Sequence, residues 1–353
     1  MQLAGFKHIP GKHCGSTALR NVTVFFHHDY LKDFDLTSEA NCFGLGAGMG
    51  FCYGLANDPP YNYLMGRALL LTETYLKNLK VPHKIHEFNT PTELVEHTQK
   101  RLQQGLPTIL QSDVHFLPYY NSPLHFTGHV FVVIGEENSH FITSDTHFKE
   151  PQSADFDAVK QAVSYASPLF RGINKCFDID GGPELTKNEL GDAIMASLRQ
   201  TVHNYVETLD QNLLKENDFF KEADLGYKGL QYFKESFAEN YLNSPNQIDD
   251  AMFLYQVIER RGTGGGAFRL MMAEYLNNTA GFLGHPQLKQ QAELCLTLGT
   301  RWQEFAGCFR ALYLQKGADT VEGSAAQNKA FALARELAER EEDLITNLDE
   351  IAA

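Results

Sequence analysis

The sequence predicts an α+β fold, in which a domain with a small antiparallel sheet is followed by an all-helical domain. Val130 to Gly135 is the strongest strand pattern, and Phe141 to Asp145 follows it beyond a short turn, which predicts an antiparallel pair. Beyond residue 185 every periodic segment has helical spacing. The turn-rich run DIDGGP separates the two regions. We therefore expect two domains, residues 1–180 and residues 181–353.

Helical and extended patterns alternate in the first domain. Apolar residues recur at helical spacing in residues 15–26, and Thr37 or Ser38 is well placed to cap a second, short helix. Residues 63–79 also show helical spacing, which Pro82 ends. In order, we expect helices over residues 15–26, through Ala40 and Cys42, over 63–79 and over 91–104, and strands over residues 84–88, 107–114, 130–135 and 141–145.

The second domain has a helical pattern throughout. Leu333, Leu337, Leu344 and Leu348 fall on one stripe, as in a helix that packs on a core. This domain either covers the cleft of the first domain or mediates a homodimer. Its expected helices span residues 185–214, 229–260, 266–276, 286–315 and 325–351.

Two glycine-rich runs have two interpretations each. In FGLGAGMGF, residues 43–51, alternate glycines favour close packing of two backbone segments over close approach to a substrate. RGTGGGAFR, residues 261–269, lacks the preceding strand that a dinucleotide-binding motif requires. We expect a plain helix junction there, and the alternative is an anion site at a helix N-terminus that involves Arg261 or Arg269.

Composition and charge exclude several classes of function. The chain has 353 residues and a net charge of −14, which opposes the phosphate neutralisation that nucleic-acid binding needs. No apolar run reaches the roughly 18 residues of a membrane span, and residues 1–10 lack a secretory signal. We expect a cytoplasmic protein. The six cysteines include no CxxC pair, so neither a disulfide framework nor a zinc site is expected, and no metal-binding residue is assigned.

Cys14 is the strongest candidate for a nucleophile. It begins a predicted helix, where unpaired N–H groups and the helix dipole favour negative charge. Such a position lowers the pKa of a cysteine thiol and supplies N–H groups for an oxyanion. The alternative is a small buried cysteine with no chemical role.

His129 and Asp145 complete a candidate triad with Cys14. His129 opens the strongest strand, 115 residues after Cys14, and Asp145 ends the neighbouring strand. The start of one hairpin strand and the end of its partner lie side by side. Asp145 is therefore placed to accept a hydrogen bond from Nδ1–H of His129 and to orient the ring as the base for Cys14.

Several motifs resemble one enzyme family. HCGSTALRN, LTSEANCFGLGAGMGF, LPYY before TGHVFVVIG, and RGTGGGAFR are similar to motifs of the butirosin-biosynthesis BtrH-like acyltransferases, across nearly the whole chain. The first half also resembles the peptidase C39-like branch of papain folds. The resemblance implies a papain-like catalytic domain over residues 1–180, with Cys14 as nucleophile, His129 as base and Asp145 as orienting group.

The resemblance also implies a substrate class. BtrH-like enzymes take an acyl group from an acyl carrier protein thioester, and the same chemistry extends to coenzyme A donors, with a small-molecule amine as acceptor. The donor is then linked to phosphopantetheine, and the enzyme needs no cofactor. C39-type peptidases have an oxyanion-binding glutamine six residues before the cysteine, where this chain has His8. His8, His13 or backbone N–H groups therefore take that role.

Three weaker features stay open. Lys7, Lys12 and Arg20 precede the first acidic residue, so this segment either attracts an anionic partner or is basic by chance. Glu39 either binds a substrate amine or favours the dipole of the helix that it begins. Asp113 either contacts substrate or forms a turn. Two rival functions also remain: a papain-like cysteine peptidase or amidase with the same triad, and a non-catalytic binding protein.

Overall fold

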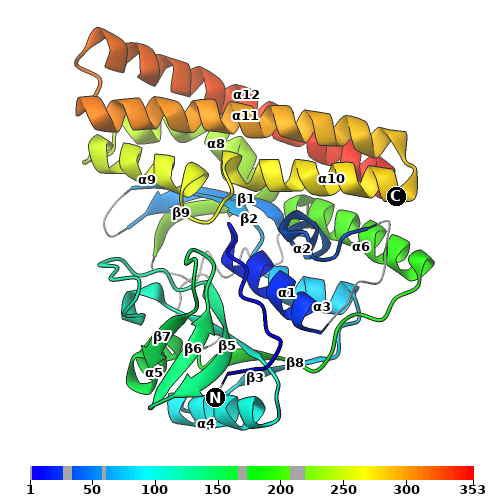
Figure 1. The fold of residues 1–353 in the computed structure, drawn as a ribbon. Coiled ribbons are helices and arrows are strands. Elements are labelled where there is room, and N and C mark those ends of the chain that lie inside the picture. The colour runs from blue at the N-terminus through cyan, green and yellow to red at the C-terminus, as the bar shows by residue number, and fades with distance from the viewer. Residues whose placement is uncertain (1, 27–33, 58–60, 166–172, 207–218) are drawn as a thin grey trace. The chain divides into compact units, whose positions relative to one another are not determined.

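The chain forms two compact units. The computed structural model describes residues 2–26, 34–57, 61–165, 173–206 and 219–353 (Figure 1). Unit 1 comprises Met1–Cys42 and Leu69–Leu190, and unit 2 comprises Phe43–Ala68 and Gly191–Ala353. Residues 43–68 therefore belong with the C-terminal half, which a single boundary near residue 180 does not capture.

Unit 1 contains a six-stranded antiparallel sheet in the order β3-β8-β4-β5-β6-β7. The predicted antiparallel pair is confirmed, since Val132 pairs with Ser144 and Val133 with Thr143. The predicted strands near residues 84–88 and 107–114 are present as β3 and β4. The strands are β3 (His83–Glu87), β4 (Thr108–Ser112), β5 (His129–Glu137), β6 (His140–Ser144), β7 (Gln152–Asp155) and β8 (Lys175–Ile179).

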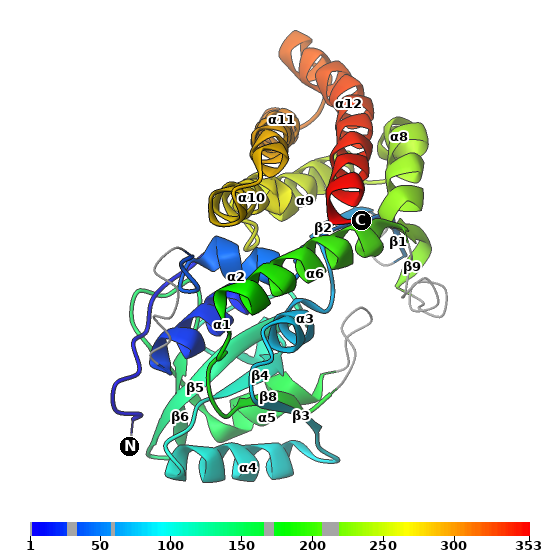
Figure 2. The ribbon, with the colours of Figure 1, turned by 90° about the vertical axis from the view of Figure 1, so that its right-hand side faces the viewer.

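Helices cover both faces of this sheet. α1 (Cys14–Phe25) and α3 (Leu71–Asn78) lie on one face, while α4 (Pro91–Gln103) and α5 (Phe156–Ser164) lie on the other (Figure 2). The α4 and α5 side is a single apolar core that includes Leu94, Phe131 and Val159. The Thr90 side chain accepts from the Glu93 N–H and the Glu93 side chain accepts from the Thr90 N–H, a capping box that fixes the start of α4.

Unit 2 combines a three-stranded sheet with helices. The strand order is β2-β1-β9, and α11 and α12 run side by side as a long antiparallel pair (Figure 1). Its elements are β1 (Met49–Ala56), β2 (Asn62–Arg67), α6 (Lys187–Val206), β9 (Phe220–Leu225), α8 (Gly226–Leu242), α9 (Gln247–Glu259), α10 (Arg269–Leu283), α11 (Pro286–Gln315) and α12 (Val321–Ala352). Two helices cross the boundary between the units in the sequence: the short helix α2 (Glu39–Leu45), and α6, whose first four residues belong to unit 1.

The predicted α+β class with a helical C-terminal region is confirmed, and several details differ. The single helix expected over residues 229–260 is two helices, α8 and α9, which residues 243–246 separate. The helix expected over residues 63–79 is wrong in its first half, because residues 62–67 form β2 and only residues 71–78 are helical. The C-terminal region also contains one strand, β9, which pairs with β1. The expected helix over residues 185–214 is present as α6 to Val206, and its last part lies outside the described residues.

Close packing explains several glycines of β1 and β2. A Cβ on Gly66 would lie 2.5 Å from Arg269 Nη1, and a Cβ on Gly50 would lie 2.9 Å from the Ala68 nitrogen. A Cβ on Gly54 would lie 2.4 Å from that of Ala223 on the neighbouring strand. These glycines let backbone segments approach one another, which is the packing interpretation expected of the run at residues 43–51.

A buried ion pair lies in the core of unit 2. Arg269 and Glu341 are both fully buried, and Arg269 Nε donates to Glu341 Oε1 at 2.6 Å. The Trp302 indole N–H also donates to Glu341 Oε1, at 2.9 Å. The guanidinium donates further to the carbonyls of Gly66 and Gly50. Arg269 therefore holds β1, β2, α10 and α12 together, and it has no role as an anion-binding residue.

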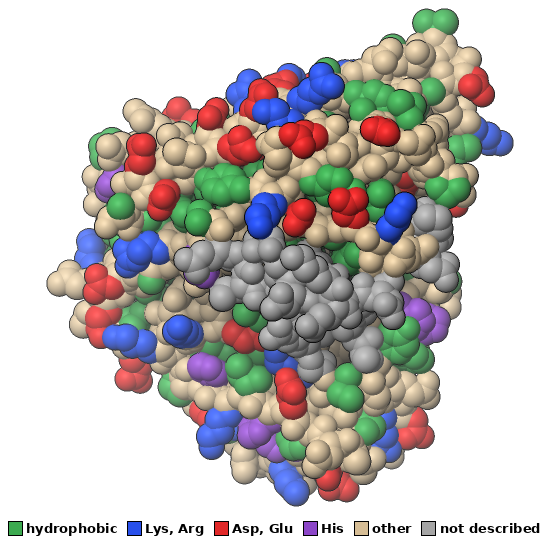
Figure 3. Space-filling model, turned by 180° about the vertical axis from the view of Figure 1, so that it is seen from behind, with side chains coloured by type: hydrophobic (Ala, Val, Ile, Leu, Met, Phe, Trp, Pro, Cys, Tyr) green, Lys and Arg blue, Asp and Glu red, His purple; other side chains and the backbone are tan. Residues whose placement is uncertain are grey.

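Among the described residues, the face of the surface in Figure 3 has no large basic patch of the kind that nucleic-acid binding needs. On the face shown in Figure 3, acidic and basic side chains are interspersed, and the basic ones do not gather in one patch. Within the described ranges, no helix is both long and apolar enough to cross a membrane.

Candidate active site

The site begins with Cys14, the first residue of α1. His13 is the N-cap, and its Nδ1 accepts from the Ser16 backbone N–H at 3.3 Å. No acidic residue lies in the first turn of this 12-residue helix, so none of its own side chains opposes the action of the helix dipole on the Cys14 sulfur. A Cβ on Gly15 would lie 3.1 Å from Cε1 of His13, so glycine leaves room for that ring.

Two histidines act on the Cys14 thiol. Burial alone would raise its pKa, but the electrostatic effect of His13 and hydrogen bonds with His129 and His13 outweigh burial. Together they hold the pKa of Cys14 well below its usual value. Cys14 is 8 % exposed, and two imidazole rings interact with its sulfur. This environment favours a thiolate.

His129 is the partner of that thiolate. It begins β5, which anchors it, and its Nε2 donates to Asp145 Oδ2 at 2.9 Å. The sequence predicted that Nδ1 of His129 would donate to Asp145, and that prediction is wrong. Because Nε2 donates to Asp145, Nδ1 is the ring nitrogen that remains for the hydrogen bond with the Cys14 sulfur. Burial lowers the pKa of His129, but the charge of Asp145 and the hydrogen bonds to Asp145 and Cys14 raise it to about 10.

Asp145 is held by four donors. Oδ2 also accepts from the Tyr119 hydroxyl at 3.0 Å, and Oδ1 accepts from the Tyr120 hydroxyl at 2.9 Å and the Thr146 N–H at 2.6 Å. Burial would raise the pKa of Asp145, but His129 and the two tyrosines hold it below its usual value. LPYY could be recognised in the sequence as a motif, but the contact of its two tyrosines with Asp145 could not.

Glu39 organises the backbone directly before Cys14. Its Oε1 accepts from the N–H groups of Lys12 at 2.9 Å and His13 at 2.7 Å. The hydroxyls of Ser16 and Thr17 also donate to Oε1, at 3.3 Å and 3.0 Å. The carboxylate is thus committed to the turn that leads into α1. The geometry favours a positioning role over the binding of a substrate amine.

For the acyl transfer that the sequence resemblance implies, a Glu39→Gln variant is expected to slow acylation of Cys14 by about 10- to 100-fold, because the amide replaces one acceptor oxygen by a donor and the turn shifts. Single-turnover acylation without an amine acceptor measures this effect. Glu96→Gln, at an exposed position of α4, is the control and should leave the rate unchanged. If Glu39→Gln instead acylates normally and raises only the KM of the amine, Glu39 contacts the acceptor and the positioning role is wrong.

Two family models match the chain. The family model "Butirosin biosynthesis protein H, N-terminal" matches residues 13–146. A second model, "Domain of unknown function (DUF4872)", matches residues 157–348, which is more than half of the chain. The chain belongs to the BtrH-like family. No curated protein matches it.

The first match spans the whole candidate site of this BtrH-like protein. Cys14, His129 and Asp145 all lie within residues 13–146. The second match contains the buried pair of Arg269 and Glu341. Membership of the family indicates a biosynthetic enzyme.

The remaining candidates of the BtrH-like chain have other tasks in unit 1. His8 has both ring nitrogens engaged, with Nδ1 2.8 Å from Ser144 Oγ and Nε2 2.8 Å from the Phe148 carbonyl oxygen. Asp113 is fully buried and accepts from the N–H groups of His115 and Phe126. These bonds agree with the turn role, one of the two interpretations of Asp113, rather than with a substrate contact. Neither side chain presents an unused donor to Cys14.

Of the basic residues that the sequence singled out, the arginines are bonded within the protein and the lysines are exposed. Arg20 is buried and donates to the carbonyls of Ile9 and Pro10, whereas Lys7 and Lys12 are exposed. Arg261 belongs to unit 2, where it lies over the Phe253 ring and its side chain donates to Gln256. Only the two lysines of the leading segment therefore stay available to an anionic partner in solution.

Proposed function

We propose that this BtrH-like protein transfers an acyl group from a thioester to an amine through an acyl-enzyme on Cys14. The observation that carries the proposal is the Cys14–His129–Asp145 arrangement, in which the pKa of the thiol is held well below its usual value. A thiolate attacks a thioester readily, because one thioester is exchanged for another of similar energy.

In the first step the Cys14 thiolate attacks the carbonyl carbon of the donor thioester. The new bond from carbon to Sγ forms as the bond to the donor sulfur breaks. The His129 imidazolium gives its proton to the departing thiolate, so the donor leaves as a thiol and His129 becomes neutral. The hydrogen bond from His129 Nε2 to Asp145 keeps the ring oriented through both states.

In the second step an amine attacks the acyl-enzyme. Neutral His129 accepts a proton from the amine nitrogen as the new amide forms, and Cys14 leaves as a thiolate. The products are an amide and the original pair of thiolate and imidazolium, so the cycle closes with atoms and charge balanced. Water must be kept from the acyl-enzyme for this step to exceed hydrolysis.

His13 is the favoured side-chain donor to the developing oxyanion. A backbone N–H can only donate, so the bond from Ser16 N–H to His13 Nδ1 is made by the tautomer of the neutral ring that carries its proton on Nε2. The charged ring also has a proton on Nε2, so this nitrogen can donate in either state. His13 also interacts with Cys14 directly. The N–H groups at the start of α1 supply the second part of such a site, and His8 is committed elsewhere.

The proposed donor is an acyl carrier protein, with acyl coenzyme A as the alternative source of the same phosphopantetheine thioester. The family name supports a place in biosynthesis. The exposed Lys7 and Lys12 favour a phosphate-bearing donor, although the net charge of −14 opposes an acidic carrier at long range. The acceptor is a small-molecule amine.

Intact-mass spectrometry tests the proposal. The full chain is incubated with a series of acyl-pantetheine thioesters, and the Cys14→Ala variant serves as the control. We expect one acyl adduct on the wild type, none on the variant, and loss of the adduct when an amine is added, with amide as product. Cleavage of peptides without any adduct from thioesters would favour a cysteine peptidase, and absence of both reactions would favour a binding protein.

A further inference from the structure

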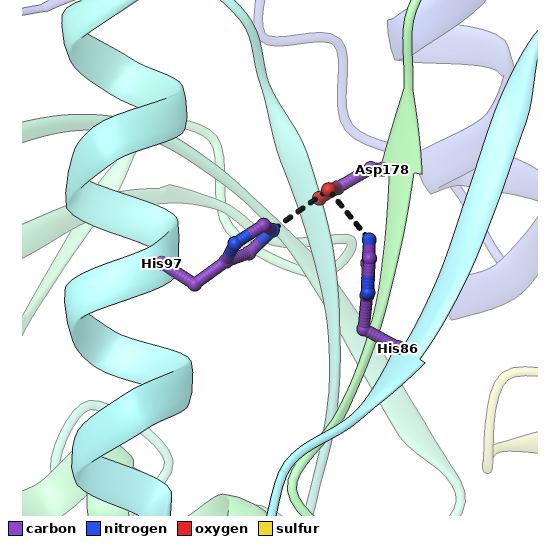
Figure 4. Close-up of side chains that lie close together, drawn as sticks. All are labelled: His86, His97 and Asp178. Atoms are coloured by element: carbon purple, nitrogen blue, oxygen red, sulfur yellow. Dashed lines mark hydrogen bonds and ion pairs between the residues drawn. The ribbon is translucent and has the colours of Figure 1, made fainter.

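Two histidines and one aspartate converge on the far side of the sheet of unit 1. Nε2 of His97 lies 2.7 Å from Asp178 Oδ2, and Nε2 of His86 lies 3.3 Å from the same oxygen (Figure 4). His86 comes from β3, His97 from α4 and Asp178 from β8. The three atoms lie within 4.8 Å of one another.

These separations resemble the edges of a metal coordination polyhedron. Zinc bonds to imidazole nitrogen and carboxylate oxygen are about 2.0–2.1 Å long, which places neighbouring tetrahedral ligands about 3.3 Å apart. Two of the three edges, at 2.7 Å and 3.3 Å, are already close to that length. The imidazole side chains are 33 % and 25 % exposed, which leaves an entry path and a fourth position for water.

The surroundings favour a fixed ligand set. Arg101 Nε lies 3.5 Å from Asp178 Oδ1, and Thr108 donates to that same oxygen at 3.4 Å, so Oδ2 is left to the histidines. Arg101 also forms an ion pair with Asp180, whose Oδ1 lies 2.5 Å from Arg101 Nη1. This second carboxylate reduces the repulsion between Arg101 and a bound cation. Both imidazole rings also contact the Phe88 ring. Such supporting contacts orient metal ligands in proteins.

This cluster is separate from the candidate active site. Asp178 pairs with Thr108, Thr108 pairs with Val133, and His129 lies four residues before Val133. Two strand spacings of about 4.8 Å and four residues of about 3.3 Å place Asp178 and His129 about 16 Å apart along the sheet. The cluster therefore has no part in the acyl-transfer steps.

We propose that His86, His97 and Asp178 bind a divalent transition-metal ion, with Zn²⁺ as the preferred ion and water as the fourth ligand. Two neutral imidazoles and one carboxylate match the ligand types and the number that zinc takes in three-ligand sites. The ion would join α4 to β3 and β8, and so would stabilise this edge of unit 1. The site goes beyond the proposed acyl transfer and does not depend on it.

Zinc titration of the full chain tests the site. Because a thiolate beside an imidazole is itself a zinc ligand, the titration uses the Cys14→Ala variant after removal of metal by a chelator. Calorimetry with Zn²⁺ alone should give one ion per chain at pH 7.5. Adding His97→Ala in the same background should weaken binding by more than about 100-fold, since even supporting residues change metal affinity by 10- to 100-fold.

Two further variants and two further measurements make the test decisive. His140→Ala, which removes an exposed histidine from β6, is the matched control and should bind zinc normally. His86→Gln provides a second variant if His97→Ala fails to fold. Co²⁺ should give the intense visible bands of a four-coordinate ion, and Zn²⁺ should raise the thermal unfolding midpoint of Cys14→Ala but not of Cys14→Ala/His97→Ala.

Two outcomes would overturn the site. Equal zinc affinity in the His97, His86 and His140 variants would mean that the ion binds elsewhere. A Co²⁺ spectrum of the hydrated ion, together with no zinc-dependent stabilisation, would mean that the three residues form only an ion-paired cluster.

Discussion

Replacement of Cys14 by alanine is expected to reduce the rate of acyl transfer by at least about 10⁴-fold. The variant keeps His129 and Asp145 but lacks the sulfur that accepts the acyl group, so only direct attack of the amine on bound thioester remains. The rate of amide formation, measured by mass spectrometry at saturating thioester and amine, gives the ratio between wild type and variant.

Cys308→Ala is the matched control for this loss. Cys308 lies in α11, and burial raises the pKa of its thiol, so its removal should leave transfer unchanged. A Cys14→Ala protein that retained more than about one tenth of the wild-type rate would exclude an acyl-enzyme at this position. In that case the amine would attack the donor directly, and His129 alone would act as the base.

Replacement of Glu341 by alanine is expected to lower the free energy of unfolding by about 3–5 kcal/mol, because it leaves the buried charge of Arg269 without its partner. The Trp302 indole and the Tyr205 hydroxyl also lose their hydrogen bonds to this carboxylate. Urea unfolding followed by circular dichroism measures the change.

Glu339 supplies the comparison on the same helix. Its carboxylate is 59 % exposed and pairs with Lys234 at the surface, where solvent screens such a pair and its contribution to stability is small. The free energy of unfolding of Glu339→Ala should therefore be close to that of the wild type. Equal midpoints for the Glu341 and Glu339 variants would show that Arg269 finds other compensation and that the buried pair does not hold unit 2 together.

Local patterns were enough to predict much of unit 1 and the candidate triad. The helix after Cys14 and the pair of strands β5 and β6 follow from short-range periodicity, which needs no knowledge of the fold. His129 and Asp145 lie at adjacent ends of that pair, so their hydrogen bond could be predicted, although the nitrogen that makes it could not. Ring orientation depends on packing that the sequence pattern does not contain.

Long-range contacts account for what the sequence did not reveal. β9 forms a strand because it pairs with an edge of β1 that β2 leaves free. In this register Leu225 pairs with Cys52, which lies 173 residues earlier in the chain, and the alternation of β9 itself is weak. Glu39 looks like an ordinary first-turn acid until the turn before Cys14 folds onto it. His86, His97 and Asp178 share no local motif, so only the fold of unit 1 brings them together.

The central claim concerns the ionisation of Cys14, and the pH dependence of its alkylation by iodoacetamide tests that claim most directly. An ordinary thiol with a pKa of about 8.5 is only about 0.3 % thiolate at pH 6. Because the pKa of Cys14 is lowered, its thiolate should persist as the pH falls and be lost only below that lowered pKa. Burial raises the pKa of the other five cysteines, so the label should map to Cys14.

At pH 6 we expect Cys14 to react on the order of 10-fold faster than free cysteine, even though a less basic thiolate is a weaker nucleophile. Its rate should change little between pH 6 and pH 9, and His129→Ala should remove much of this advantage. A rate that instead fell about tenfold for each pH unit below 8.5, as for an ordinary thiol, would contradict the account.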